Sequence, residues 1–319
     1  GQDAPSVVKE NPYCLIDVIT GVGFLTADEI AKNVGYKVEG GPRIRAGILH
    51  VLKEQAFSRG HVCLPLSTLG HEAAKLLALK EEFIIHQFNG LVEDRLMTIK
   101  DKFAYLQTLF EAEQLISNKL KILVRQDLPV GRPEIKGLAP DQIDAINKAV
   151  SCGVFILTGA PGTGKTFTIK RIIESFPDCS VALAAPTGRA AKRMFEQSGI
   201  PALTIHKLLD PQKVDGKFVF TRGHDNPLEE NLIVLDEMSM VDTPLFARFL
   251  DAVAPGTRLI LVGDTYQLPS VGPGNVLKDL IACGQIPCTE LTIIKRQDEG
   301  LIIRNCHRIK NGQDVELEN

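Results

Sequence analysis

The sequence of 319 residues contains no tryptophan, and aromatic residues make up only 6% of it. A protein that stacks successive bases on aromatic side chains needs more such residues, so a surface of that kind is not expected. No run of about 18 apolar residues occurs, which excludes a transmembrane helix. The first residues lack a basic stretch followed by an apolar one, so they do not form a signal peptide. We therefore expect a cytoplasmic protein with no membrane partner.

Positive charge is not in excess either, because 36 Lys and Arg residues stand against 39 Asp and Glu residues, for a net charge of -3. The overall charge does not indicate a nucleic-acid partner, although a local basic stripe would be sufficient to bind one. The seven cysteines form no Cys-x-x-Cys pair, and Cys283 and Cys288 have no partner at the spacing of a zinc site. We expect free thiols in a reducing compartment.

The composition that is present, 44% hydrophobic and 24% charged residues, is typical of a folded chain with about two domains. Helical periodicities dominate before residue 130, and short apolar runs alternate with helical ones after it. We expect a helical N-terminal region over 1–130 and an α/β domain over 131–319. The segment 127–137 contains two Pro and two Gly, which is typical of a linker or of a surface excursion.

In the N-terminal region, a short apolar helix after Leu15 leads into Gly21-Val-Gly23. Thr26 can cap a second helix at this point, with Glu29 three residues later as its capping-box partner. Further helices are predicted over 42–58, 71–80 and 101–124.

The second region begins with a continuous apolar run over 154–158, which is typical of a strand buried on both faces. Strands alternate with helices from there onward, and this alternation predicts an α/β fold with a parallel sheet and helices on both faces. The predicted strands are 154–158, 180–185, 231–236 and 258–263, with one helix ending at Phe176 and another over 187–198.

Between the first of these strands and its helix, GAPGTGKT (159–166) matches the phosphate-binding pattern G-x-x-x-x-G-K-[ST] at every fixed position. The glycines allow successive backbone N–H groups to face one anion, and the N-terminus of the helix adds partial positive charge. Lys165 would reach the β- and γ-phosphates, and the hydroxyl of Thr166 would ligate Mg²⁺. The predicted nucleotide-binding residues are Gly159, Ala160, Pro161, Gly162, Thr163, Gly164, Lys165 and Thr166.

An acidic pair, Asp236-Glu237, ends a later apolar strand. Asp236 can hold Mg²⁺, and Glu237 is placed to take a proton from the attacking water. Strand ends are often acidic for solvation alone, but the pairing with a P-loop favours the functional interpretation. The two motifs together predict hydrolysis of a nucleoside triphosphate, with Mg²⁺ as cofactor.

Two further residues follow apolar runs. Gln267, in GDTYQLP (263–269), should lie at the same sheet edge as Lys165, because parallel strands place their carboxyl ends together. Its amide can contact a γ-phosphate or orient water, or it is a loop side chain in solvent. For Arg296, spacing alone does not decide between an arginine finger and a surface charge.

This ordered set of motifs resembles the superfamily 1 DNA helicases, and within them the RecD-like branch. The segment NPYCLIDVITGVGFLTADEIA (11–31) is similar to the N-terminal region of the longer RecD-like proteins. The other matching segments are GAPGTGKT (159–166), AAPTGRAAKRM (184–194), TIHKLL (204–209), LIVLDEMSMVD (232–242), LVGDTYQLPSVGPGNVL (261–277) and KRQ (295–297).

The resemblance implies a RecA-like motor domain and a role for several residues. Gln142 matches the glutamine that reads the adenine of ATP, Gln267 the residue that couples the γ-phosphate to DNA, and Arg296 an arginine on the γ-phosphate. Hydroxyls and positive charge can hold phosphate oxygens without reading sequence. His206 is equally well interpreted as a core or capping histidine. The segments that would lie along single-stranded DNA contribute Pro186, Thr187, Arg189, Thr204 and His206.

Gly21-Val-Gly23 resembles the turn of a helix-hairpin-helix motif, near residues 15–35. Its backbone N–H groups could hold a phosphate of duplex DNA, or the segment is a plain tight turn between two packed helices. Both interpretations remain open from the sequence.

The resemblance implies an ATP-dependent DNA helicase or translocase of recombination or repair, similar to the α-chain of exodeoxyribonuclease V. A non-motor, DNA-binding regulatory ATPase is the alternative. A P-loop kinase is not favoured, because it has no use for a surface that follows a DNA strand. Superfamily 1 motors carry a second RecA-like domain, so we expect this chain to be a fragment that hydrolyses ATP slowly and does not unwind DNA by itself.

Overall fold

The computed structural model describes residues 8–19, 21–214, 216–293, 305, 308–309 and 312–316. The chain divides into two compact units. The first unit comprises Gly1–Ala112 with Val271–Gly274, and the second comprises Glu113–Ser270 with Asn275–Asn319. The sequence-based boundary near residue 130 lies downstream of this division and stays a prediction. Within the described part of the chain, no helix combines the length and the apolar character needed to cross a bilayer.

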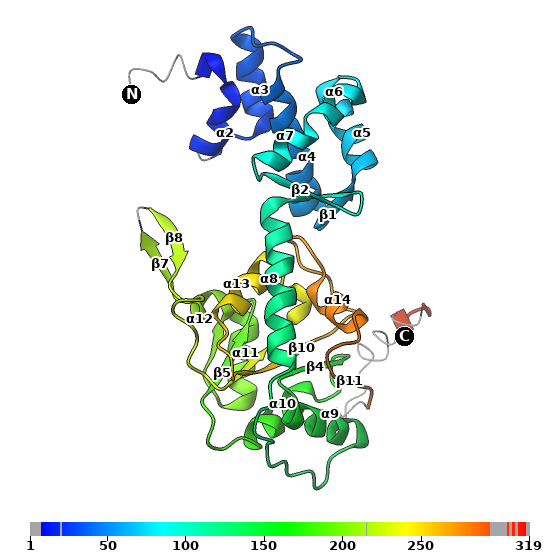
Figure 1. Cartoon of the computed structure of the whole chain (residues 1–319). Helices are drawn as coiled ribbons and strands as arrows, with labels where there is room; N and C mark the ends of the chain where they lie inside the picture. The colour runs from blue at the N-terminus through cyan, green and yellow to red at the C-terminus, as the bar shows by residue number, and fades with distance from the viewer. Residues whose placement is uncertain are drawn as a thin grey trace. The chain divides into compact units, whose positions relative to one another are not determined.

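The first unit consists mainly of helices around one core of buried apolar side chains (Figure 1). In the helix predicted over 42–58, Ile44, Ile48 and Leu52 are buried at helical spacing. β1, β3 and β2 form a small antiparallel sheet in that order. The elements are the 3-10 helix η1 (Pro12–Cys14), α2 (Leu15–Val18), α3 (Phe24–Asn33), α4 (Gly41–Arg59), β1 (Cys63–Pro65), α5 (Leu66–Leu77), α6 (Glu81–His86), α7 (Phe88–Glu93), β2 (Met97–Lys100) and β3 (Phe103–Leu106).

The helix predicted over 101–124 is wrong in its first part. Residues 101–102 have positive φ angles and form the turn of a hairpin, after which β3 runs over Phe103–Leu106. Side chains of β3 alternate between more exposed and buried positions, which is the two-residue period of a strand. The helix predicted over 71–80 is displaced as well, because α5 spans Leu66–Leu77.

Thr26 does not cap the second helix, contrary to the sequence-based expectation. α3 begins at Phe24, with Gly23 in the N-cap position, so Thr26 lies inside the first turn. The ring of Phe24 is buried in the core of the unit, and the carbonyl of Gly23 accepts the N–H of Ala27 at 3.1 Å. Burial of the aromatic ring thus fixes the start of this helix before the threonine.

A buried ion pair ties the helix after the Gly21–Gly23 turn to α4. The Nε of Arg43 donates to Asp28 Oδ1 at 2.7 Å, and its Nη2 donates to Oδ2 at 3.2 Å. The hydroxyl of Tyr13 donates to the same carboxylate at 2.7 Å. Burial alone would raise the pKa of Asp28, but the hydrogen bonds from Arg43, Tyr13 and Lys32 outweigh it and hold that pKa well below its usual range.

We expect Asp28→Asn to lower the free energy of unfolding by about 3 kcal/mol at neutral pH, because it leaves Arg43 buried without its counter-charge. The folded-state pKa of Asp28 lies below the unfolded value, so the stabilisation is complete above the unfolded pKa and is lost as the pH falls toward the folded one. The difference between wild type and variant should therefore shrink below about pH 4. Denaturation followed by circular dichroism measures both effects, with Glu196→Gln in the exposed pair with Lys192 as the control. A difference independent of pH would contradict this account.

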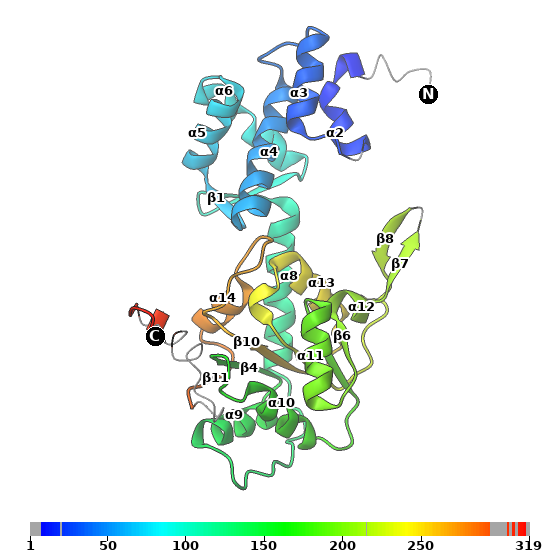
Figure 2. The ribbon, with the colours of Figure 1, turned by 180° about the vertical axis from the view of Figure 1, so that it is seen from behind.

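The second unit is a three-layer α/β fold around a six-stranded sheet of order β11-β4-β10-β9-β5-β6, in which all neighbouring strands are parallel. The α/β fold predicted from the sequence is confirmed. β7 and β8 form a separate antiparallel hairpin on the side of the sheet where β6 is the edge strand (Figure 2). The elements are α8 (Gln107–Val124), which begins in the first unit, α9 (Pro140–Ser151), β4 (Val154–Gly159), α10 (Lys165–Glu174), β5 (Val181–Ala185), α11 (Gly188–Ser198), β6 (Ala202–Thr204), α12 (Ile205–Leu208), β7 (Pro211–Val214), β8 (Lys217–Phe220), β9 (Leu232–Leu235), the 3-10 helix η2 (Met238–Met240), α13 (Thr243–Ala252), β10 (Arg258–Gly263), α14 (Val276–Ala282) and β11 (Cys288–Leu291).

Two apolar cores lie on opposite faces of the sheet. One is formed with α8, α13 and α14, and the other with α9, α10 and α11. Figures 1 and 2 show these two groups of helices from the two sides. Along β4, Phe155 and Leu157 enter the second core while Val154 and Ile156 enter the first. A strand covered on both faces must be apolar at every position, which explains the continuous apolar runs in the sequence.

The segment 127–137 lies on the second unit as a surface excursion. The N–H of Gly131 donates to the carbonyl of Val150 at 3.2 Å, and the N–H of Arg132 donates to that of Ser175 at 2.9 Å. These bonds connect the segment to the ends of α9 and α10. Of the two interpretations from the sequence, the excursion therefore describes the segment better than a free linker.

Candidate active site

The predicted P-loop connects the end of β4 to the start of α10. Gly164 is the N-cap of α10 with a φ of 88°, a left-handed conformation that favours glycine. A Cβ on Gly159 would lie 2.7 Å from the carbonyl oxygen of Leu291 and 2.9 Å from Oγ1 of Thr163. The loop is therefore packed closely against β11, and the local backbone requires glycine at these positions.

Lys165, the first residue of α10, is partly buried among three carboxylates. Its ammonium donates to the carbonyl oxygens of Gly159 at 2.6 Å and Ala160 at 3.2 Å. Burial lowers the pKa of Lys165, while the charges of Asp264, Asp236 and Glu237 oppose that shift. The arrangement holds a cation beside the backbone of the P-loop, where a phosphate chain could replace the carbonyl oxygens as its partner.

Asp236 and Glu237 follow β9, two strands away from β4 in the sheet. Oδ1 of Asp236 accepts the N–H of Glu237 at 2.8 Å. Burial raises the pKa of Asp236 to about 6, and the charge of Glu237 adds to the shift. A cation would stabilise the ionised form of this half-buried carboxylate, and the oxygens of Asp236 and Thr166 are ligands that Mg²⁺ prefers. These two residues therefore fit the predicted magnesium site.

Glu237 has a left-handed backbone conformation, with φ 54° and ψ 41°. Such a conformation costs about 1–3 kcal/mol for a residue other than glycine, and strain of this kind is typical of functional sites. It directs the chain sharply away from β9 into η2. The backbone thus supports the special role predicted for this carboxylate.

A cavity of about 580 Å³ brings most of the predicted residues together at the carboxyl edge of the sheet. The oxygen Oε1 of Gln267 accepts from the hydroxyl of Ser239 at 3.4 Å, so the loop after β10 contacts the segment after β9. The predicted residues that line this cavity are Pro161, Gly162, Gly164, Lys165, Thr166, Asp236, Glu237 and Gln267.

Of the described residues predicted to bind nucleotide, Gly159, Ala160, Thr163 and Gln142 do not line this cavity. The side chain of Gln142 is buried, and its Oε1 accepts the N–H of Ala139 at 3.2 Å in a capping arrangement at the start of α9. Its Nε2 donates to Oγ1 of Thr168 on α10 at 3.3 Å. Gln142 therefore lies beside the P-loop helix, and its contact with adenine stays a prediction. Arg296 lies outside the described residues.

The residues predicted to follow single-stranded DNA lie at the same edge of the sheet, at and after the carboxyl ends of β5 and β6. Ala185 pairs with Thr204, which places the segment beginning at Pro186 beside the start of α12. The hydroxyls of Thr187 and Thr204 cap α11 and α12, at 3.2 and 3.1 Å from the backbone N–H groups that they accept. Arg189 and His206 are exposed. The interpretation of His206 as a core histidine is therefore wrong, and contact with DNA stays a prediction.

In the first unit, Gly21 and Gly23 form the turn before α3. Gly21 has a φ of 93°, and neither glycine has any atom within 4 Å of an added Cβ. The turn is thus open toward its surroundings, and nearby Val18 and Leu25 expose 77% and 60% of their surface. Both sequence-based interpretations of the turn are compatible with this geometry.

Two residues of the site were missed by sequence reasoning. Asp264 is buried directly after β10 and is the carboxylate with the largest effect on the pKa of Lys165. Asp264 directly follows a strand, as Asp236 does, and this position is the sequence signal that could have identified it as a site residue. Arg193 on α11 lines the cavity with Lys165. No spacing in the sequence distinguished it from the other charged residues of α11.

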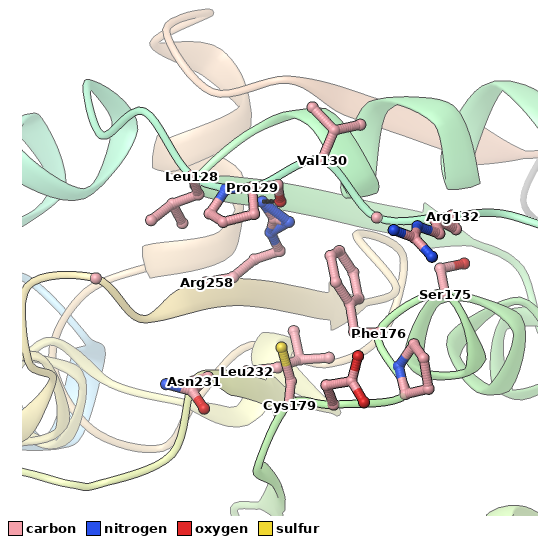
Figure 3. Close-up of a pocket in the computed structure, with 14 residues that line it drawn as sticks. Leu128, Pro129, Val130, Arg132, Ser175, Phe176, Cys179, Asn231, Leu232 and Arg258 are labelled. Atoms are coloured by element: carbon pink, nitrogen blue, oxygen red, sulfur yellow. Dashed lines mark hydrogen bonds between the residues drawn. The ribbon is translucent and has the colours of Figure 1, made fainter.

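A second cavity, of about 350 Å³, lies at the opposite edge of the sheet, where the strands begin (Figure 3). The guanidinium of Arg258 donates to the carbonyls of Val150 and Pro129 and lies 4.5 Å from the ring centroid of Phe176. Arg258 thereby holds the segment before α9 on the unit. The phosphate-binding loop and the acidic pair line the other cavity, so the candidate site is at the carboxyl edge.

Comparison with known proteins identifies similar families in both units of the chain. Residues 137–318 match the model of a family described as AAA domain, and residues 1–63 match a model described as ATP-dependent RecD2 DNA helicase HHH domain. The first match contains all six strands of the parallel sheet. It also contains Asp236 and Glu237 after β9 and Asp264 after β10.

Two curated relatives are similar to this chain. The ATP-dependent RecD2 DNA helicase of Deinococcus radiodurans is 30% identical over 98% of this chain and 46% of its own length. The RecBCD enzyme subunit RecD of Mycobacterium tuberculosis is 38% identical over 57% of this chain and 36% of its own length. A solved structure of Bacteroides Pif1 bound to single-stranded DNA aligns with a TM-score of 0.38 and 24% identity, over 56% of this chain and 47% of that chain.

The chain spans less than half the length of each of these two curated relatives. The family model for the AAA domain nevertheless covers more than half of the chain, residues 137–318. The chain therefore belongs to the AAA domain family and is similar to the RecD2 helicase of Deinococcus radiodurans over nearly all of its own length.

Proposed function

We propose that the chain is the ATP-hydrolysing part of a RecD-like DNA helicase or translocase, which moves along single-stranded DNA in recombination or repair. The observation that carries the proposal is the cavity at the carboxyl edge of the sheet, where the P-loop faces Asp236, Glu237 and Gln267. The relatives named for DNA helicase activity support the same function. Its place of action would be the cytoplasm.

In this proposal, the backbone of the P-loop binds the phosphate chain of ATP and Lys165 neutralises charge on the β- and γ-phosphates. Thr166 and Asp236 would hold Mg²⁺, which supplies neutralisation of the charge that develops on the phosphate oxygens. Glu237 orients the attacking water and accepts its proton. Gln267 would contact the γ-phosphate. Its hydrogen bond from Ser239 would link this contact to the segment after β9. Gln142 would contact adenine, and Arg296 the γ-phosphate.

The DNA surface would lie over the carboxyl ends of β5 and β6. Thr187 and Arg189 begin α11, and Thr204 and His206 begin α12, beside it. Contacts of this kind bind the phosphate backbone and do not read bases. In the first unit, the turn at Gly21–Gly23 would hold a phosphate of duplex DNA through backbone N–H groups.

Binding to an oligothymidine strand tests the DNA surface. We expect sequence-independent binding that weakens about tenfold or more between 50 and 200 mM salt, because phosphate contacts release counterions. Arg189→Ala should weaken binding and reduce the slope of log affinity against log salt. Fluorescence anisotropy with a labelled strand, and a blunt duplex as competitor, measures these effects. Affinity that hardly changes with salt, or a slope unaffected by Arg189→Ala, would argue against a surface that follows the backbone.

A further inference from the structure

Helix α11 forms a wall of the nucleotide cavity opposite α10, and the two helices lie side by side (Figure 2). Met194 is buried in the core between them and the sheet, which fixes the rotation of α11. With that rotation, Ala190, Arg193 and Gln197, at helical spacing, face the cavity. Arg193 therefore shares one cavity with Lys165.

Among the residues that the structure describes, no carboxylate lies within ion-pair distance of Arg193. The other arginine in the cavity, Arg171, is paired with Glu174 at 3.0 Å. The neighbouring lysine on α11, Lys192, does not line the cavity and lies 3.8 Å from Glu196 on the exposed side of the helix. Arg193 thus has a guanidinium available for a ligand, whereas Arg171 and Lys192 each face a carboxylate.

The cavity brings Arg193 together with both parts of the site. Its lining includes Lys165 of the P-loop and the acidic pair Asp236 and Glu237. The guanidinium of Arg193 therefore shares one cavity with the P-loop and the acidic pair.

We infer that Arg193 binds the γ-phosphate of ATP and makes the site distinguish ATP from ADP. The inference rests on the proposed ATP hydrolysis at this cavity. The terminal phosphate must lie between Lys165 and the base Glu237 for the reaction to occur, and Arg193 lines the same cavity as these two groups. A guanidinium can hold two phosphate oxygens at once, which a single ammonium cannot. Arg193 would thus supply a second cation from within the same unit.

The test is equilibrium binding of two probes, the magnesium complexes of ADP and of adenylyl-imidodiphosphate, by calorimetry. We expect Arg193→Ala and Arg193→Gln to weaken the triphosphate analogue about tenfold to a hundredfold, which is the effect of a charged hydrogen bond, and to change ADP affinity less than about threefold. Lys192→Ala, next to it on the same helix, should bind both probes like the wild type. Arg193 is exposed, so the variants should keep the wild-type circular dichroism and melting temperature.

Equal losses for the two probes, or no loss for the triphosphate analogue in either variant, would overturn the inference and leave the proposed function intact. If the wild-type chain binds neither probe, the proposed function fails, and the inference fails with it. The comparison of variants with wild type therefore separates the two outcomes.

Discussion

Lys165→Ala should abolish ATP binding at concentrations that saturate the wild-type chain, with a loss of affinity of about a hundredfold or more. The ammonium of Lys165 lies on the carbonyl oxygens of Gly159 and Ala160, at the point where the P-loop turns into α10. It is the cation within the loop itself, and its removal leaves a phosphate chain facing Asp236 and Glu237. The variant therefore loses the attraction between Lys165 and the phosphates. It also loses the positive charge that screens the phosphates from the two carboxylates.

Titration with a fluorescent ATP analogue in the presence of Mg²⁺ measures this effect. Lys192→Ala removes the same charge from the exposed side of α11 and should leave the affinity unchanged. Binding of oligothymidine should persist in Lys165→Ala, because the proposed DNA surface is on β5 and β6. A variant that binds ATP as tightly as the wild type would show that the P-loop is not the nucleotide site.

Glu237→Gln should keep ATP bound and lower the rate of hydrolysis by about 10²–10⁴-fold, because only the proton acceptor is removed. The substitution conserves shape, and the N–H that Asp236 accepts is a backbone group, so the local bond at 2.8 Å remains possible. The left-handed backbone conformation of Glu237 fixes the direction in which its side chain leaves the backbone. The amide of glutamine can still orient a water molecule but cannot take its proton.

Phosphate release under saturating Mg·ATP, together with ATP affinity, separates binding from chemistry. Glu174→Gln is the matched control, since Glu174 lines the same cavity but is paired with Arg171 at 3.0 Å. Its rate should stay within about threefold of the wild type. Hydrolysis by Glu237→Gln at the wild-type rate would mean that another group acts as the base.

The sequence predicted that the P-loop and the acidic pair lie together at one sheet edge, because each motif there is tied to the backbone. Gly164 needs a left-handed conformation, Gly159 approaches the carbonyl oxygen of Leu291, and the carboxylates follow buried strands. The parallel sheet then places all strand ends at one edge, so residues far apart in sequence meet. Fold class and the lining of the cavity could be predicted for this reason.

Other features depend on packing that no local pattern records. The short strand β3 follows a turn with positive φ angles, and its four residues are too few to distinguish the period of a strand from that of a helix, so the sequence predicts helix there. The start of α3 is set by the burial of Phe24, not by Thr26. Arg193 became part of the site through the rotation of α11, which Met194 fixes from the core.

The most direct test of the central claim, a single nucleotide site at the carboxyl edge of the sheet, is hydrogen–deuterium exchange with and without Mg²⁺ and adenylyl-imidodiphosphate. Nucleotide should slow exchange of the backbone amides over 160–166 and next to Asp236, because they become enclosed or hydrogen-bonded. Exchange over 128–132 and 176–179, which line the cavity at the opposite edge, should not change. Protection of that opposite edge, or unchanged exchange over 160–166 with nucleotide bound, would contradict the account.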